Sequence, residues 1–230
     1  DHRDLHYPLR RQRQMCIRDR VINLGECDLN IYKGRLGIIC SGGADSSLLL
    51  YNLLKHTDTT VDVFTLANNG LDNKNVVAIT NIINYCVKAT DNHRVRHHVT
   101  HMQGNKPDGP RSIYETTKGY GLDYIYDGIT RNPPPEILET MDTTVSPRDK
   151  NRDGDGTPNL EWVEELKCYS YAPWAKLTKK QLAKIYKDFN LLETLFPLTY
   201  SCEEYGLDTM DHCGKCWWCQ ERLWAFGRLV

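Results

Sequence analysis

Apolar and polar positions change their spacing along the chain, and the changes predict strands and helices in turn. The run RLGIIC at 35–40 is short, apolar and partly β-branched, which predicts a buried strand. The segment at 45–56 has leucines at helical spacing and ends in Lys-His, which suits a helix C-terminus. The alternation continues with a strand at 60–68, a helix at 73–89, a strand at 93–101, a helix at 111–122 and a strand at 123–130. This order predicts an α/β fold in which helices cover both faces of a parallel sheet of about five strands.

The alternation fails between 131 and 158. Three consecutive prolines are followed by the polar string SPRDKNRDGDGTPN, and a loop of this length is typical of a lid or of a disordered segment. Part of the string nearly fits a calcium-binding loop, but Glu161 comes one residue late, so we favour a flexible acidic lid. A last helix is expected at 178–189, before a cluster of cysteines.

Residues 1–22 stand apart from this pattern. They are charged, lack periodicity and do not begin with Met, and the string MCIRDR resembles translated sequencing-adapter sequence. We expect a non-native or disordered arm at 1–22, and the alternative is a genuine basic N-terminal arm.

Length and charge narrow the class of protein. A chain of 230 residues can form one domain, or one domain with a small appendage, around a proper hydrophobic core. Its 29 Lys and Arg against 30 Asp and Glu leave a net charge of −1, which provides no overall field for nucleic acid. No apolar stretch approaches the roughly 18 residues of a membrane span, and no signal peptide is apparent. We therefore expect a soluble cytoplasmic protein with no membrane partner and no direct contact with nucleic acid.

Four of the nine cysteines crowd the C-terminus, namely Cys202, Cys213, Cys216 and Cys219. The other five are scattered singly. An odd total with one tight cluster favours metal binding in a reducing compartment over a disulfide framework. Two overlapping CxxC turns bring three sulfurs together and Cys202 closes a tetrahedral shell, which zinc prefers in structural sites. An iron–sulfur cluster and a chance gathering of buried thiols are the alternatives. His212 could in principle replace one thiolate, although four sulfurs suffice.

The string CSGGADSS at 40–47 joins the first expected strand to the first expected helix. Gly42 and Gly43 permit a tight turn whose amides converge with the free N–H groups of the helix start, which makes an anion-binding nest. Three hydroxyls can donate to phosphate oxygens, those of Ser41, Ser46 and Ser47. Asp45 suits a Mg²⁺ that bridges those oxygens, whereas the lysine and spacing of a Walker loop are absent. The alternative is an ordinary glycine turn with an Asp or Ser helix cap.

This string resembles the SGGxDS signature of the N-type ATP pyrophosphatases, also called PP-loop enzymes. The resemblance implies an adenine nucleotide alpha hydrolase-like fold and an enzyme that cuts ATP between the α and β phosphates to form an adenylate. It also implies Mg²⁺ carried with ATP, at the carboxyl ends of the strands. The residues assigned to ATP are Cys40, Ser41, Gly42, Gly43, Ala44, Asp45, Ser46, Ser47 and Gly128.

The C-terminal element resembles that of the 7-cyano-7-deazaguanine synthase family. The family motif SC…HCGxCxxCxxRxxAF is matched by Ser201-Cys202, His212-Cys213-Gly214, Cys216, Cys219, Arg222 and Ala225-Phe226. The stretch APWAKLTKKQL also resembles the family and aligns Pro173 and Lys179. Two catalytic residues are implied, Asp45 on Mg²⁺ and Lys179 on the negative charge of the transition state. The alternative makes Lys179 a solvated helix residue.

The reaction implied by the resemblance is carbon–nitrogen bond formation by a ligase. 7-Carboxy-7-deazaguanine and ammonia would give the nitrile base 7-cyano-7-deazaguanine (preQ0), used in queuosine biosynthesis, through adenylated intermediates. The implied domains are the arm at 1–22, a PP-loop ATP-binding domain at 23–200 and a zinc-binding element at 201–230, in which Zn²⁺ is structural. A homodimer is also implied.

Two segments depart from the family. The chain has LANNGLDNKN where the family has a YGQxH-type segment, and TRNPPPE where it has DxxxYPDC. Both lie where substrate selectivity would be set, so the activation chemistry is better supported than the deazaguanine substrate. The alternatives are another adenylating enzyme, of the tRNA thiolation or amidotransferase-like type, and a non-catalytic nucleotide-binding module.

Four histidines fall on the strand expected at 93–101, at positions 93, 97, 98 and 101. Adjacent strand residues such as His97 and His98 point to opposite faces, so we expect no common metal site there. Solvated or capping histidines are expected instead.

Overall fold

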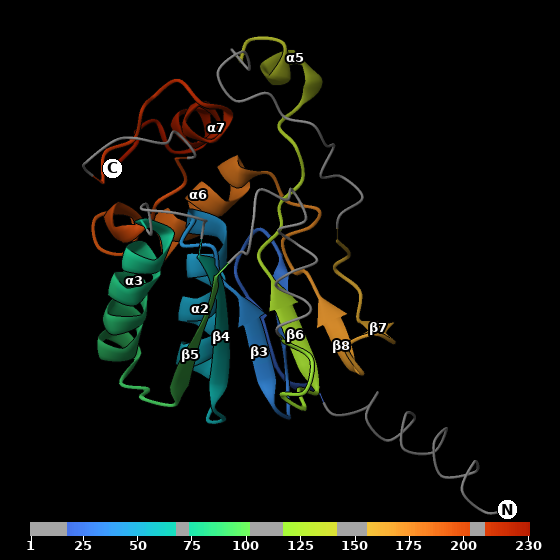
Figure 1. The fold of residues 1–230 in the computed structure, drawn as a ribbon. Helices are drawn as coiled ribbons and strands as arrows, with labels where there is room; N and C mark the ends of the chain where they lie inside the picture. Colours follow the sequence, from blue (N-terminus) through green and yellow to red (C-terminus); the bar gives the residue numbers. More distant parts are fainter. Residues whose placement is uncertain (1–17, 68–73, 102–116, 142–155, 203–209) are drawn as a thin grey trace, which may run out of the picture.

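A six-stranded sheet forms the centre of the computed structural model, which describes residues 18–67, 74–101, 117–141, 156–202 and 210–230 (Figure 1). The strand order is β5-β4-β3-β6-β8-β7. The bounds are β3 (Leu36–Ile39), β4 (Val61–Ala67), β5 (Val95–His101), β6 (Tyr124–Asp127), β7 (Glu161–Val163) and β8 (Cys168–Tyr171). All neighbouring pairs are parallel except β7 with β8. The predicted parallel sheet of about five strands is therefore confirmed, with an antiparallel strand added at one edge.

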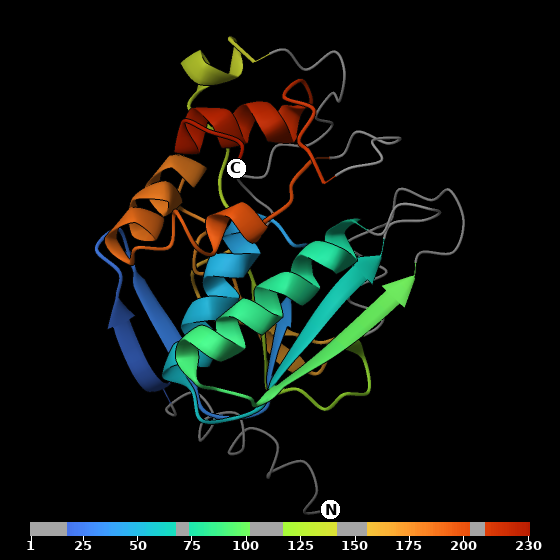
Figure 2. The same cartoon turned by 90° about the vertical axis from the view of Figure 1, so that its left-hand side faces the viewer.

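One face of the sheet is covered by α2 (Ala44–His56) and α3 (Lys74–Thr90), which lie side by side in Figure 2. Their leucines and isoleucines join Leu36, Ile38 and Val63 in the main core, because alternate strand residues face the same side. Burying these apolar side chains is the main source of stability, at about 25 cal/mol for each Å² removed from water.

The opposite face carries a second, smaller core. Phe64 and Ile125 from the sheet pack there with Leu122, and Tyr120 makes an edge contact with the Phe64 ring. Of the helix predicted at 111–122, the part at 111–116 lies outside the described residues, and the part at 118–122 is turn or irregular structure. A helix on this face therefore stays a prediction. The described residues place α2 and α3 together on the first face.

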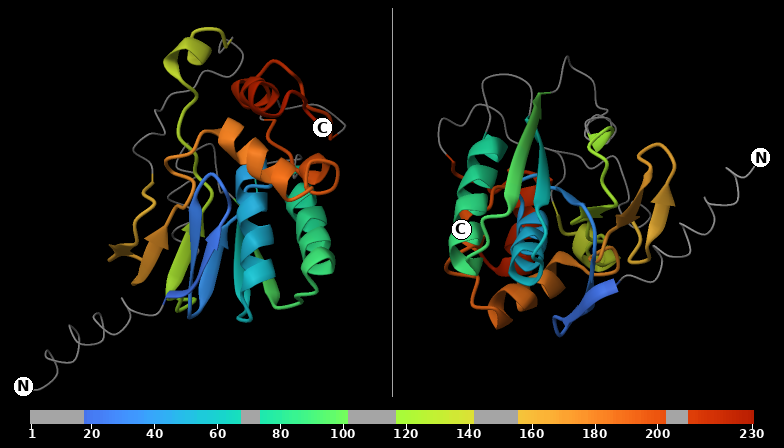
Figure 3. Two further views of the ribbon diagram at one scale, coloured as in Figure 1. Left: turned by 180° about the vertical axis from the view of Figure 1, so that it is seen from behind. Right: turned by 90° about the horizontal axis from the view of Figure 1, so that it is seen from below.

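An N-terminal hairpin was missed by the sequence pattern. It consists of β1 (Arg18–Asn23) and β2 (Asp28–Tyr32), which pair antiparallel and lie beside the main sheet (Figure 3). Leu29 and Ile31 of β2 are fully buried, and the backbone N–H of Tyr32 donates to Oη of Tyr126 at 3.0 Å. Residues 18–22, which the sequence analysis placed in the arm, therefore form most of a strand.

The remaining elements follow β6 and β8. They are α5 (Pro135–Leu138), α6 (Lys179–Asp188), the 3-10 turn η2 (Phe196–Leu198) and α7 (Trp217–Phe226). Helix α6 packs against both α2 and α7, near the carboxyl ends of the parallel strands (Figure 1). The string proposed as an acidic lid lies mainly in 142–155, outside the described residues. None of the described helices is both long and apolar enough to span a membrane.

The adjacent histidines of β5 bond to side chains of β4 rather than being solvated or capping residues. Nε2 of His97 lies 2.9 Å from Oγ1 of Thr65, whereas Nε2 of His98 lies 2.8 Å from Oδ1 of Asp62. Thr65 and Asp62 belong to opposite faces of β4, so the two rings are separated by the sheet. Within the described residues, the histidines of β5 form no metal-ligating group.

Candidate functional site

The string at 40–47 lies where the sheet reverses its direction of winding. From β3 the chain runs through α2 to β4 on one side, whereas β6 lies on the other side of β3. The carboxyl ends of β3 and β6 therefore flank a topological switch point, where open α/β sheets bind ligands.

Two glycines shape the turn between β3 and α2. Gly42 has φ +86°, a conformation that favours glycine, and a Cβ there would lie 3.1 Å from the backbone oxygen of Asn75. Gly43 is the N-cap residue and offers no side chain to the first N–H groups of α2. The Asp or Ser cap considered as an alternative is absent at the N-cap position, so the start of α2 retains the donors that anion binding uses.

The side chains of the loop divide into exposed and buried sets. Ser41 is exposed, and its Oγ accepts a hydrogen bond from the Gly43 backbone N–H at 3.3 Å. Ser46 and Ser47 donate their hydroxyls to the Gly43 carbonyl, at 3.3 and 2.7 Å. The side chains of Cys40, Ala44 and Ser47 are almost completely buried.

Gly128 brings the end of β6 against the start of α2. A Cβ at Gly128 would lie 2.8 Å from both the Cα and the backbone N of Ser46. Beyond it, Oγ1 of Thr130 donates to Oδ2 of Asp45 at 3.4 Å. Gly128, assigned to ATP by the resemblance, thus lies against the loop through close contact between two backbones.

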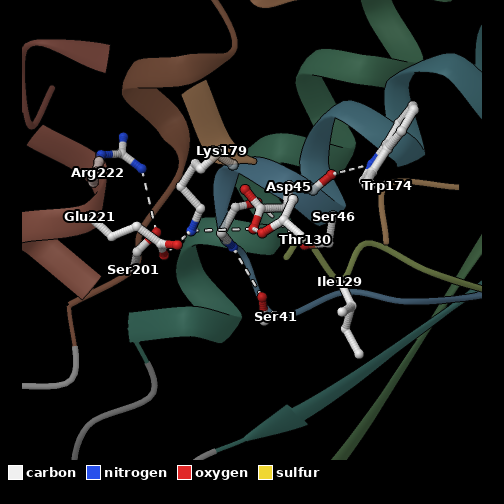
Figure 4. Close-up of polar contacts among 12 residues, drawn as sticks. Ser41, Asp45, Ser46, Ile129, Thr130, Trp174, Lys179, Ser201, Glu221 and Arg222 are labelled. Carbon is white, nitrogen blue, oxygen red and sulfur yellow. Dashed lines mark hydrogen bonds and ion pairs between the residues drawn. The ribbon is translucent and has the colours of Figure 1, made fainter. Parts of the chain in front are cut away.

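Asp45, Lys179 and Glu221 form a buried charged triad (Figure 4). Nζ of Lys179 lies 3.2 Å from Oδ2 of Asp45 and 3.0 Å from Oε2 of Glu221. The exposed fractions of the side chains are 17% for Asp45, 5% for Lys179 and 0% for Glu221. Lys179 is therefore not the solvated residue of the alternative interpretation. The two residues predicted as catalytic are in direct contact.

Asp45 fits the role of a Mg²⁺ ligand. Its Oδ1 atom is buried and has no hydrogen-bond partner among the described residues. A buried carboxylate oxygen without a donor is costly, and a hard divalent cation would satisfy it. The triad also carries two carboxylates against one ammonium, so a cation would balance its charge.

Several contacts from neighbouring residues hold the triad in place. Nε1 of Trp174 donates to the carbonyl of Asp45 at 3.2 Å, and Oη of Tyr186 donates to that of Ala44 at 2.7 Å. Thr178 caps α6 through a reciprocal capping box with Gln181, which fixes Lys179 as the first helical residue. The S/T-x-x-Q spacing of this cap was visible in the sequence, but the partners of Trp174 and Tyr186 were not.

The four clustered cysteines converge as predicted. Their Sγ atoms, from Cys202, Cys213, Cys216 and Cys219, all lie within 4.8 Å of one another. The Sγ atoms of Cys213 and Cys219 are 3.9 Å apart, close to the edge of a tetrahedron with metal–sulfur bonds of about 2.3 Å. The backbone N–H groups of Lys215 and Cys216 donate to Sγ of Cys213 at 3.3 and 3.2 Å. The arrangement fits one metal ion, whereas a four-iron cluster would hold each sulfur on a different iron, further apart.

The thiols need a cation to ionise together. The hydrogen bond that the Cys219 thiol donates to Cys216, and then burial, raise the pKa of Cys219 well above its usual range. A divalent ion reverses this balance because it binds thiolates directly.

Arg222 lies beside the cysteine cluster, and the acceptors of its hydrogen bonds are neutral groups. Its guanidinium donates to Oγ1 of Thr199 at 2.7 Å and to the carbonyl of Phe196 at 3.1 Å. Burial lowers its pKa to about 10, although Asp45 and Cys219 oppose this shift. A metal bound by four thiolates carries excess negative charge, and the Arg222 cation is placed to offset it.

The comparisons with known proteins are sparse. No family model and no curated protein matches the chain. Among solved structures, NMN synthetase from Francisella tularensis is similar, with a TM-score of 0.45 and 12% sequence identity over 85% of this chain and 78% of that chain. The functional argument therefore rests on the geometry of the site.

Proposed function

We propose that this protein is an ATP-dependent adenylating enzyme of the PP-loop class. The observation that carries the proposal is the meeting of three groups at the switch point of the sheet. The glycine turn presents an uncapped helix N-terminus, Asp45 presents a buried oxygen, and Lys179 presents an ammonium 3.2 Å from Asp45. These are the donors, the cation ligand and the positive charge that a nucleoside triphosphate requires.

Each part of the site has a separate role toward ATP in this proposal. The backbone around Gly42 and Gly43 holds phosphate oxygens, with the hydroxyl of Ser41 at the exposed side. Asp45 would hold Mg²⁺, which neutralises charge on the phosphates. Lys179 stabilises the negative charge that builds up as pyrophosphate leaves. No side chain of the triad is a covalent nucleophile in this scheme.

The substrate we propose is 7-carboxy-7-deazaguanine, with ammonia as the second reactant. A carboxylate oxygen attacks the α-phosphorus, pyrophosphate leaves, and ammonia displaces AMP to give the amide. The amide oxygen is adenylated in turn, and loss of AMP and a proton gives the nitrile preQ0. This choice of substrate is supported by the resemblance of the cysteine element to that of the 7-cyano-7-deazaguanine synthase family. The same resemblance supports a homodimer.

We propose Zn²⁺ for the cysteine site, in a structural role. Four thiolates fill the coordination of a single ion and leave no position for a substrate, as in closed structural sites. The cysteines described outside the cluster are free thiols, which suits a reducing cytoplasm.

The test is to incubate the purified protein with Mg-ATP, ammonium and 7-carboxy-7-deazaguanine, and to analyse the products by mass spectrometry. AMP together with the nitrile supports the full proposal, and AMP with the amide alone restricts it to one adenylation. ATP binding without AMP formation in the presence of the base would contradict this enzyme function and favour a binding module. Lys179→Met should abolish AMP formation, whereas Lys184→Met, on the same helix but facing Glu26, serves as the matched control.

A further inference from the structure

Glu221 is a buried carboxylate that the proposed reaction does not use. It lies on α7, two residues after the metal-ligating candidate Cys219, and its side chain is 0% exposed. Its Oε2 atom lies 3.0 Å from Nζ of Lys179, which comes from a different helix. Nothing in the cysteine motif requires an acidic residue at this position.

A carboxylate in such surroundings needs a permanent counter-charge. Removing an ion from water costs several kcal/mol, and a close partner of opposite charge offsets that cost. The ion pair with Lys179 supplies such a partner. The electrostatic dependence also runs the other way, because Lys179 is itself nearly buried.

The two carboxylates around Lys179 differ in what they can do when a nucleotide arrives. Asp45 lies on the loop at 40–47, its side chain is 17% exposed, and its buried Oδ1 atom has no hydrogen-bond partner among the described residues. Glu221 is fully enclosed and lies on the helix that begins at the cysteine cluster. If Asp45 turns to Mg²⁺, Glu221 remains as the fixed partner of the ammonium.

We propose that Glu221 is a positioning residue that holds Lys179 at the phosphate loop. It also connects the loop to the cysteine cluster, since Cys216 caps α7 and Cys219 lies in its first turn. A metal ion that fixes the start of α7 thereby fixes Glu221 and, through it, Lys179. The role of Lys179 in catalysis rests on the proposed function, but its dependence on Glu221 does not.

The first test uses stability and therefore needs no substrate. Glu221→Gln preserves the shape of the side chain and removes its charge. In the wild type it should lower the melting temperature, because Lys179 loses a partner. In the Lys179→Met background it should raise the melting temperature, because it removes a buried charge that no longer has the ion pair with Lys179. A drop of equal size in both backgrounds would overturn the proposal.

The second test reads the position of Lys179 directly. An amine-reactive reagent followed by peptide mass spectrometry should label Lys179 at least about threefold faster in Glu221→Gln, because a buried charge without its partner favours open conformations. Glu26→Gln, which removes an ion pair with Lys184 of the same helix, should leave labelling of Lys179 unchanged. Equal labelling in Glu221→Gln and in the wild type would also overturn the proposal.

Kinetics then separate positioning from substrate binding. In Glu221→Gln, kcat for AMP formation should fall by about 10²-fold while the Kd of Mg-ATP changes little, because a misplaced group acts mainly on the transition state. A loss confined to Kd would contradict a positioning role. If no variant and no wild type forms AMP, the proposed function fails, but the stability and labelling results still decide the role of Glu221.

Discussion

Nζ of Lys179 lies 3.2 Å from Oδ2 of Asp45, and this ion pair joins the first residue of α6 to the first turn of α2. The loop that follows β3 and the helix that follows β8 are therefore parts of one site. Because both groups are largely buried, the contact is less screened by salt than a surface pair would be. The ion pair holds these two elements together by charge in the absence of any ligand.

Removal of Lys179 should be costly for the fold as well as for activity. Lys179→Met leaves Asp45 and Glu221 without their shared cation, and breaking a buried pair in this way costs about 3–5 kcal/mol. Urea unfolding monitored by circular dichroism measures this loss. Lys184→Met removes a more exposed pair and should cost about 1 kcal/mol or less. Similar losses in the two variants would argue against the triad.

Substitutions at Gly128, after β6, and at Gly43, in the loop, should have different effects on folding and on the proposed nucleotide binding. Gly128→Ala places a Cβ 2.8 Å from the backbone of Ser46, so we expect a loss of about 1–3 kcal/mol in the free energy of unfolding. Gly43 has φ −75°, and a Cβ there meets only the hydroxyls of Ser41 and Ser201, at 3.3 and 3.5 Å. Gly43→Ala should therefore cost about 1 kcal/mol or less.

The main expected effect of Gly43→Ala is on the affinity for Mg-ATP. A methyl group in the turn narrows the nest, so the affinity for Mg-ATP should fall by about tenfold or more, equivalent to about 1.4 kcal/mol. Isothermal titration calorimetry with a non-hydrolysable ATP analogue measures this affinity. Unchanged affinity in a folded Gly43→Ala variant would mean that the phosphates bind elsewhere.

The cysteine site should bind one zinc ion per chain and stabilise α7. Cys216→Ser should abolish stoichiometric zinc and lower the melting temperature, because metal binding to such a site contributes directly to folding. Cys27→Ser, outside the cluster, should retain the metal. Elemental analysis gives the metal content, and a brown protein with several irons would contradict the single-ion site.

Local patterns explain how much of this site could be predicted. The turn at Gly42 and Gly43 and the cysteine spacing are local, so they could be identified without coordinates. Lys179 could be assigned only by resemblance, because its burial depends on α7 folding back over α6. Glu221 carried no signal, since a lone Glu within a helix is usually exposed, and only its approach to Lys179 gives it a role.

The same reasoning applies to the fold. The strands β3, β4, β5 and β6 were predicted because buried parallel strands are apolar or alternate clearly. The hairpin of β1 and β2 was missed because its first strand is charged, and β7 is only three residues long. Both are stabilised by contacts with distant parts of the chain, such as that between Tyr32 and Tyr126.

The stability of the protein should fall in mild acid, in part through His97. Burial, and then the nearby His98, lower the pKa of His97 below its usual value of about 6.5. Between pH 6.5 and that lower value the unfolded chain binds a proton that the folded chain does not, so the free energy of unfolding decreases as the pH falls. Above pH 6.5 this contribution is fully present.

His97→Gln can retain the hydrogen bond to Thr65 and removes the titrating ring. Urea unfolding between pH 5 and pH 8 should therefore show a weaker pH dependence in His97→Gln than in the wild type. Some slope should remain, because burial also lowers the pKa of His56. His93→Gln is the matched control, since the side chain of His93 is 78% exposed. A slope that is the same in the wild type and in His97→Gln would show that His97 is protonated equally in the folded and unfolded states.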